Sequence, residues 1–361
     1  MKALFYSPYL DSLGGGERYV LTLVEALNKQ GWETDLLWEG EPVSKEVKEK
    51  FGIDISGTKY VSLAKATLSS ENFVLKLLDR YKFMREYDLV FWLSDGSMPL
   101  LFGRKNLIHF QSPFRGVGGG SLFSQLKKLK VDEFVVNSEF TKKFIDNEFG
   151  IGSVVIFPPV EVGEITPDKK ENAILYVGRF SNLMQLKGQE LVLKAFKELC
   201  DTGVKNYQLW LAGSTGVGTG KLLGNLKSEA INYPVEFFEN AGWADLKSLY
   251  GRAKFFWSAS GYEADEENEP EKCEHFGISL VEAMAGGCVP IVTNRGGYKE
   301  IVVAGRSGIL WNSQSEWLNE TTRLMNDDKL VAELSKSAVE RAEDFSKEKF
   351  VKKFMEVIKR S

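Results

Sequence analysis

Two glutamates eight positions apart flank the start of a predicted helix. Glu274 precedes this helix, and Glu282 lies inside it among apolar residues such as Leu280 and Met284. A carboxylate in such surroundings is mostly desolvated unless another group hydrogen-bonds to it. Gly277 lets another molecule approach the backbone, and the unpaired N–H groups of the first helical turn attract anions. A sugar at one carboxylate, a ribose at the other and a phosphate at the helix start would use every part of this segment. The alternative is a helix with two surface glutamates.

The neighbouring segments predict where this helix lies in a sheet. The aromatic run 254–260 is typical of a buried strand, and the apolar run 288–292 predicts another strand after the helix. The helix would then begin at the carboxyl end of a strand, where open α/β sheets bind ligands. Gly178-Arg179 follows a further predicted strand, and Lys187-Gly188 precedes its helix. An arginine and a lysine beside a helix terminus can neutralise a diphosphate without a metal.

The first half of the chain carries a candidate phosphate site of its own. Gly14, Gly15 and Gly16 lie between the predicted first strand and first helix, where the backbone can close on an anion. This turn has neither the P-loop pattern nor the dinucleotide fingerprint, so a tight structural turn is an equal alternative. His109 falls at the carboxyl end of the predicted strand 106–110. It is either a packed, hydrogen-bonded side chain or a group that faces a ligand.

The order of the predicted elements favours a two-domain α/β protein. A chain of 361 residues is long enough for two cores. Strands and helices alternate in each half, which argues for parallel sheets. The proline pair Pro158-Pro159 and the polar run 161–172 are typical of an interdomain linker. We therefore predict an N-terminal domain over residues 1–160 and a C-terminal domain over residues 161–344.

The composition excludes several classes of function. The chain is 27% charged with a formal net charge of −4, which argues against a nucleic-acid partner bound through a basic surface. Three separated cysteines and two histidines offer little for a zinc site, and the uneven cysteine count suits a reducing cytoplasm. No apolar run approaches the ~20 residues that span a bilayer, and the chain starts in a predicted strand rather than a signal peptide. We expect a cytoplasmic protein that sits at most on the inner face of a membrane.

Two charged segments have two interpretations each. Residues 114–130 combine basic and aromatic side chains with glycines, so they form either a peripheral contact with anionic lipid headgroups or a solvated helix face. The run of carboxylates in residues 263–269 favours a solvated loop over a metal site, because it lacks the alternation with glycine that shapes a calcium loop. The longer acidic segment 262–273, just before Glu274, would cover a ligand or contact a partner.

Taken in order, these motifs resemble the retaining GT-B glycosyltransferases of family four over nearly the full chain. The matching motifs are Gly14-Gly15-x-Glu17, His109 after a strand, Gly178-Arg179 with Lys187-Gly188, Glu274-x7-Glu282 and the Gly-Gly-Cys-Val-Pro-Ile-Val that follows. The segments 109–110 and 274–278 are most similar to mannosyltransferases that extend lipid-linked oligosaccharides on a cytosolic membrane face. The resemblance implies two doubly wound Rossmann-like domains that face each other across a cleft. It also implies a C-terminal helix, within residues 345–361, that packs back on the N-terminal domain.

The resemblance implies a catalytic role for four residues. Arg179 and Lys187 would bind the donor diphosphate and stabilise the leaving group. Glu274 would hold hydroxyls of the donor sugar, and His109 would lie near the sugar and the acceptor. The resemblance also implies a second set of residues that contact the donor. Glu282 would bind the ribose, Gly242 would lie near the base, and the backbone of the other residues would bind the phosphates. This set comprises Gly15, Gly16, Gly242, Phe276, Gly277, Ile278 and Glu282.

The reaction implied is transfer of a hexose, with mannose as one candidate, from a nucleotide-diphosphate sugar to a glycan or lipid-linked acceptor. GDP, UDP and ADP are all compatible nucleotides. The family pattern implies retention of configuration by a same-face displacement, with no metal and no cofactor. Two alternatives stay open, namely another GT-B nucleotide-sugar enzyme such as an epimerase and a non-catalytic sugar-nucleotide binding protein. A dehydrogenase would share the architecture but lacks its glycine fingerprint here.

Overall fold

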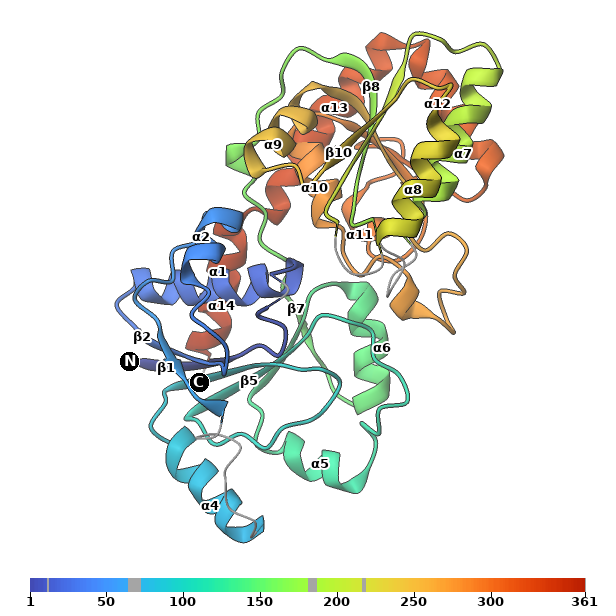
Figure 1. Ribbon diagram of the computed structural model, residues 1–361. Helices are drawn as coiled ribbons and strands as arrows, with labels where there is room; N and C mark the ends of the chain where they lie inside the picture. Colours follow the sequence, from blue (N-terminus) through green and yellow to red (C-terminus); the bar gives the residue numbers. More distant parts are fainter. Residues whose placement is uncertain (12, 64–72, 181–186, 216–218, 361) are drawn as a thin grey trace. The chain divides into compact units, whose positions relative to one another are not determined.

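The computed structural model describes residues 1–11, 13–63, 73–180, 187–215 and 219–360. The chain divides into two compact units (Figure 1). Unit 1 comprises residues Met1–Pro159 and Lys347–Ser361, and unit 2 comprises Val160–Ser346. Each unit is an α/β structure with its own parallel sheet, so the predicted fold class is confirmed. Within the described ranges, no helix is both long enough and apolar enough to cross a bilayer.

The sheet of unit 1 is doubly wound, with the strand order β3-β2-β1-β4-β5-β6-β7. Its strands are β1 (Lys2–Tyr6), β2 (Glu33–Leu37), β3 (Lys59–Val61), β4 (Leu89–Leu93), β5 (Lys105–Phe110), β6 (Glu133–Val136) and β7 (Val154–Val155). The inner strand β1 pairs with β2 and with β4, and Ala3 lies opposite both Thr34 and Leu89. All five residues of β4 are buried and apolar, as a parallel strand covered on both faces requires.

Helices cover both faces of this sheet (Figure 1). One face carries α1 (Gly15–Lys29), α2 (Ser44–Phe51) and the C-terminal α14 (Lys347–Lys359), which share one hydrophobic cluster. The other face carries α4 (Phe73–Met84), α5 (Leu122–Lys128) and α6 (Glu139–Phe149). In α14, Phe350 packs edge-on against Tyr19 of α1, with 4.8 Å between ring centroids. The last helix of the chain therefore belongs to the core of unit 1.

The sheet of unit 2 has the strand order β10-β9-β8-β11-β12-β13. Its strands are β8 (Glu171–Val177), β9 (Gln208–Gly213), β10 (Val235–Glu239), β11 (Ala253–Ser258), β12 (Val289–Thr293) and β13 (Ile309–Trp311). From β8 the chain first builds outward to β10, then returns to place β11 on the other side of β8. This reversal between β8 and β11 is the type of position at which doubly wound sheets bind ligands.

Helices also lie on both sides of the sheet of unit 2 (Figure 1). One side carries α7 (Gln189–Asp201), α8 (Thr219–Ala230) and α12 (Gln314–Met325), and the other carries α9 (Trp243–Arg252), α10 (Ile278–Ala285) and α13 (Asp328–Ala342). The short α11 (Tyr298–Ile301) follows β12. Three tryptophans anchor the core, because Trp311 stacks on Trp317 at 4.5 Å and Trp257 meets Trp317 at 4.6 Å.

Candidate functional site

Unit 2 brings Arg179, Lys187 and Glu274 together at the carboxyl edge of its sheet. Arg179 follows β8 by two residues, Lys187 comes just before α7, and Glu274 lies between β11 and α10. The Lys187 Nζ atom lies 2.8 Å from a carboxylate oxygen of Glu274, and the two side chains are only 16% and 15% exposed. Arg179 is exposed but close enough for its charge to act on Glu274. A carboxylate and two cations therefore meet where the strand order reverses.

The charges around Glu274 keep its carboxyl group ionised. Burial alone would raise the pKa of Glu274, but the charge and hydrogen bond of Lys187 outweigh burial, and His275 and Arg179 add to the effect. The pKa of Glu274 therefore falls below its usual value of 4.5. At neutral pH this carboxylate can accept hydrogen bonds from hydroxyl groups, while the neighbouring cations can bind phosphate oxygens.

Backbone packing at the glycines fixes the segment that carries Glu274. Gly277 has a φ of +119°, and a Cβ atom there would lie 2.7 Å from the ring of Tyr298. Gly296 has a φ of +54°, and its Cβ atom would lie 2.2 Å from the carbonyl oxygen of Glu274. The Gly297 N–H donates a 2.8 Å hydrogen bond to that same oxygen. The loop after β12 thus holds Glu274 in place. The sequence prediction did not include this role, although two consecutive glycines, Gly296 and Gly297, are a sign that another backbone segment approaches closely.

Substituting Gly296 tests this close packing. Gly296→Ala is expected to lower the free energy of unfolding by about 2–4 kcal/mol, because it combines a left-handed backbone with a steric clash. Gly305→Ala is the matched control, since Gly305 has a φ of +72° and nothing within 4 Å of its Cβ position. The control should lose only about 1 kcal/mol, from backbone strain alone. Chemical denaturation measures both, and equal losses would contradict the close approach to Glu274.

Glu282 is buried and hydrogen-bonded in α10. Its side chain is 6% exposed and accepts a 2.8 Å hydrogen bond from the hydroxyl of Tyr250, which is itself wholly buried in α9. This bond explains how a carboxylate is tolerated within an apolar helix. Nothing in the local sequence around Tyr250 signals this partner, because the pairing depends on how α9 and α10 pack together.

The remaining predicted donor contacts of unit 2 lie at the starts of α9 and α10. Gly242 precedes α9 in an extended conformation, and its carbonyl oxygen accepts a 2.9 Å hydrogen bond from the N–H of Leu246. Ile278 is the first residue of α10. Phe276 is almost completely buried, and its ring packs edge-on against Phe345 at 5.5 Å. Phe276 can therefore offer a ligand its backbone but little of its side chain.

In unit 1, Gly15 and Gly16 are the first two residues of α1. The Gly14 N–H donates a 2.7 Å hydrogen bond to the carboxylate of Glu17, which caps the helix. A Cβ atom at Gly16 would lie 1.9 Å from the end of the Gln111 side chain, so a larger residue at this position would have to displace that side chain. The capping bond of Glu17 thus gives this turn a structural role.

His109, the residue predicted to lie near the sugar and the acceptor, is buried in the core of unit 1. Its ring is wholly buried and stacks on Tyr19 with 4.0 Å between centroids. Its Nδ1 atom lies 3.1 Å from the carbonyl oxygen of Val135. Burial lowers the pKa of His109 to about 3, so the imidazole is neutral. His109 is a packed side chain within unit 1, and its Nε2 atom is buried without a hydrogen-bond partner among the described residues. Its role near the sugar and the acceptor stays a prediction.

The acidic segment 262–273 is attached to the loop that supports Glu274. Glu266 forms an ion pair with Lys299, and its carboxylate also accepts a 3.3 Å hydrogen bond from the Gly296 N–H. Asp265 accepts a hydrogen bond from the backbone N–H of Glu267 at 3.0 Å. In the part of the chain that the structure describes, no group of three or more His, Cys, Asp or Glu side chains could hold a metal ion. The acidic segment thus braces the candidate site from outside.

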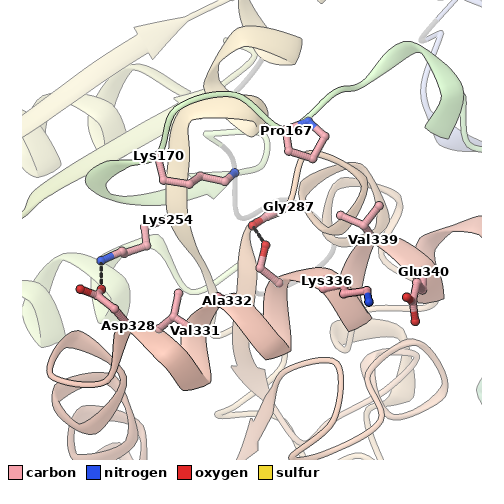
Figure 2. A pocket seen from close by; sticks show the side chains of 11 residues that line it. Pro167, Lys170, Lys254, Gly287, Asp328, Val331, Ala332, Lys336, Val339 and Glu340 are labelled. Carbon is pink, nitrogen blue, oxygen red and sulfur yellow. Dashed lines mark hydrogen bonds and ion pairs between the residues drawn. The ribbon is translucent and has the colours of Figure 1, made fainter.

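A separate pocket lies at the opposite, amino edge of the same sheet (Figure 2). It has a volume of about 540 Å³ and includes Lys170 and Lys254, which stand at the beginnings of β8 and β11. Lys254 pairs with Asp328 at 2.9 Å, and the Ser335 hydroxyl donates a 2.7 Å hydrogen bond to the carbonyl oxygen of Gly287 (Figure 2). None of the predicted site residues lines this pocket. Because doubly wound sheets bind ligands at the carboxyl edge, we do not assign it to the candidate site.

Comparisons with known proteins match both halves of the chain. The family model described as Glycosyl transferases group 1 matches residues 161–342. The model described as Glycosyltransferase Family 4 matches residues 13–164. These ranges cover the sheets of unit 2 and unit 1, and they confirm the resemblance drawn from the sequence motifs.

Individual relatives show the same affiliation. The chain is 28% identical over 223 residues to a GDP-Man:Man(3)GlcNAc(2)-PP-Dol alpha-1,2-mannosyltransferase of Neurospora crassa, a match that covers 50% of this chain and only 37% of that protein. It is 23% identical over 393 residues to a D-inositol 3-phosphate glycosyltransferase of Corynebacterium efficiens, which covers 94% and 88% of the two chains. The crystal structure of Anabaena HepE in complex with UDP and glucose superposes with a TM-score of 0.72 at 16% identity, over 99% of both chains. With its two doubly wound units, the chain therefore belongs to the group 1, family 4 type of glycosyltransferases and has the GT-B fold.

Proposed function

We propose that the protein transfers a hexose from a nucleotide-diphosphate sugar to a glycan or lipid-linked acceptor, with retention at the anomeric carbon. The observation that carries this proposal is the Lys187–Glu274 pair beside Arg179 at the strand reversal of unit 2. Mannose is the candidate sugar, since a Neurospora crassa relative is named for GDP-mannose and a dolichol-linked acceptor. UDP remains a second candidate nucleotide, because the Anabaena structure contains UDP and glucose.

The proposed chemistry uses the charges of the site in separate roles. Arg179 and Lys187 neutralise the diphosphate as the bond between the anomeric carbon and the phosphate oxygen breaks. Glu274 binds hydroxyls of the donor sugar and orients its ring. The acceptor oxygen attacks the same face of the sugar, and its proton passes to the departing phosphate oxygen. The products are the glycoside and the nucleoside diphosphate, so every atom and proton is accounted for.

Backbone groups and Glu282 complete the proposed donor contacts. The N–H groups of Phe276, Gly277 and Ile278 face phosphate and sugar oxygens, because the start of a helix attracts negative charge. Glu282 receives the ribose hydroxyls, and the base lies near Gly242. In unit 1, the backbone of Gly15 and Gly16 contacts the donor phosphates.

The proposed reaction requires neither a metal nor an organic cofactor, because the two cations supply the positive charge that the leaving group needs. We further propose that the protein acts in the cytoplasm at the inner face of a membrane, with no nucleic-acid partner. Residues 114–130 are the proposed peripheral membrane contact.

A thermal-shift screen tests the donor proposal. GDP, UDP, ADP and their sugars are added to the protein in the presence of EDTA, and one nucleoside diphosphate should raise the melting temperature. At a ligand concentration about 100 times its Kd, the expected stabilisation is about 2.7 kcal/mol.

The stabilising donor is then incubated with glycan and lipid-linked acceptors, and the products are identified. No shift with any nucleotide would contradict donor binding, and a shift that needs a divalent metal would contradict the metal-free site. Release of an epimerised free sugar without transfer would favour the epimerase alternative.

A further inference from the structure

Unit 1 gathers exposed apolar side chains on two neighbouring helices. Of twelve large hydrophobic side chains that are exposed within the described residues, eight lie between positions 75 and 129. Leu122 and Leu129, at the two ends of α5, are 78% and 79% exposed, and Phe123 between them is 60% exposed. On α4, Leu78 and Tyr81 are also exposed. A concentration of this kind marks an interaction surface, because isolated exposed apolar residues would be spread over the molecule.

The same two helices carry an excess of positive charge. Residues 75–85 contain four basic residues and one acidic residue, and residues 115–130 contain four basic residues and no acidic one. The whole chain, in contrast, has a formal net charge of −4. Lys82, Arg85 and Lys130 are exposed. The apolar side chains are thus surrounded by cations, which suits a partner with an anionic surface and an apolar interior.

Arg80 and Lys127 bring the charges of α4 and α5 close together. The Arg80 guanidinium lies 5.2 Å from the centroid of the Trp92 ring. Its Nε and Nη2 groups are buried and have no hydrogen-bond partner among the side chains and backbone that the structure describes. Burial lowers the pKa of Lys127, and the charge of Arg80 lowers it further. The Lys127 Nζ group also donates a 2.7 Å hydrogen bond to the carbonyl oxygen of Met98. Arg80 and Lys127 therefore belong to the base of the surface, and the exposed basic side chains around them are the ones that can meet phosphate groups.

We propose that α4 and α5 form a docking surface for a membrane with anionic phospholipid headgroups. This α4–α5 surface consists of Leu78, Tyr81, Leu122, Phe123, Leu126 and Leu129 with the basic residues around them. The apolar side chains enter the boundary between headgroups and acyl chains, and the exposed Lys82, Arg85 and Lys130 contact lipid phosphates. Both helices lie on the same face of the sheet of unit 1, opposite α1 and α14 (Figure 1). The proposal extends the predicted contact of residues 114–130 to a second helix, and it does not depend on the donor chemistry.

Charge favours a membrane over a second copy of the chain as the occupant. A symmetric dimer through the α4–α5 surface would place the same basic residues of two chains against each other. Like charges at such an interface repel, and they would do so around an apolar centre that cannot screen them. An anionic bilayer meets both the apolar and the basic part of the surface at once.

Sedimentation with vesicles tests the docking surface with the full chain. The protein should bind vesicles of phosphatidylcholine with phosphatidylglycerol, bind vesicles of phosphatidylcholine alone much more weakly, and detach as salt is raised. A double substitution, Phe123→Ser with Leu126→Ser, should weaken binding at least about tenfold. Ile231→Ser in unit 2 is the matched control, because Ile231 is 78% exposed and lies outside the α4–α5 surface.

Charge substitutions give an independent measurement on exposed side chains. Lys82→Glu and Lys130→Glu should each weaken vesicle binding roughly fivefold or more, since each basic residue near an anionic surface contributes about that factor. Lys45→Glu on α2 is the control and should leave binding unchanged, because α2 lies on the other face of the sheet.

Three results would overturn the proposal. The first is no binding to anionic vesicles, and the second is an equal loss with Ile231→Ser. The third is a wild-type protein that is dimeric in light scattering while the Phe123→Ser, Leu126→Ser protein is monomeric. That result would identify a second copy of the chain as the occupant. The nucleotide thermal shift is measured in parallel without vesicles. A protein that responds to nucleotide but not to vesicles overturns the docking surface alone, and the reverse result overturns the donor proposal alone.

Discussion

Replacing Glu274 with alanine is expected to reduce the rate of sugar transfer by about 10²–10³-fold, while the nucleoside diphosphate still binds. The carboxylate is ionised, mostly buried and held by Lys187 at 2.8 Å, so it is oriented before the donor arrives. Its proposed contacts are to the sugar and not to the nucleotide. The loss should therefore fall on the transfer step, measured with saturating donor, and the Kd for the nucleoside diphosphate should change little.

Two further variants make this expectation specific. Glu274→Gln keeps the shape and one oxygen acceptor but removes the charge, so its transfer rate should lie between those of wild type and Glu274→Ala. Glu271→Ala removes an exposed carboxylate three positions earlier in the same segment and should transfer sugar at the wild-type rate. A Glu274→Ala protein as fast as wild type would remove the central residue of the proposed mechanism.

The fold and much of the unit 2 site follow from short-range sequence patterns. Arg179 comes two positions after a buried apolar strand, Glu274 lies in the connection between a buried strand and the next helix, and Lys187 comes just before a helix. Because the carboxyl ends of parallel strands meet at one edge, these three residues could be placed together without a structure. Their direct pairing could not be predicted, since it joins side chains 87 positions apart.

The surroundings of His109 show what strand-end reasoning leaves undetermined. His109 is the last residue but one of β5, so its side chain still points to a face of the sheet rather than to its edge. Leu107, two residues earlier, packs in the cluster formed with α1 and α14, whereas Ile108 packs in the cluster on the other face. The ring of Tyr19 from α1 then covers His109. Which helix covers a face is a long-range property, and the sequence around His109 contains no sign of it.

Tertiary packing likewise decided the neighbours of the two glutamates. Tyr250 donates its hydroxyl to Glu282 from another helix, and Gly296 packs against the backbone of Glu274 from the loop after β12. Both partners were absent from the sequence prediction, although a buried carboxylate must have some partner. The sequence could thus indicate that Glu282 needs a hydrogen bond, and only the structure could say which residue provides it.

Replacing Lys187 with methionine is expected to impair both binding and transfer, in contrast to Glu274→Ala. Methionine keeps much of the side-chain volume but removes the charge that we assign to the diphosphate. Loss of a charge-assisted hydrogen bond should raise the Kd of the nucleoside diphosphate about tenfold or more. Loss of a group that stabilises the leaving phosphate should lower the transfer rate by about 10²–10³-fold. Lys194→Met, an exposed substitution on α7, is the control and should change neither value.

The stability of the Lys187→Met protein should also depend on pH in a defined direction. In wild type the lowered pKa of Glu274 contributes stability that is fully present above its usual value of 4.5 and is lost as the pH falls through the lower folded value. Without Lys187, burial dominates and raises the pKa of Glu274 above the unfolded value. The ionised carboxylate then destabilises the folded protein at neutral pH, and this penalty disappears when the group is protonated.

Unfolding by denaturant at several pH values measures this dependence. Breaking a buried pair costs about 3–5 kcal/mol, and the partial exposure of both side chains reduces the expected cost to about 2 kcal/mol at neutral pH. The gap between wild type and Lys187→Met should close as the pH falls toward and below 4.5, because the wild type loses its contribution while the variant loses its penalty. A gap that stays constant over this range would show that Lys187 does not hold Glu274 in its ionised form. The carboxylate would then need another source of stabilisation before it could orient a sugar.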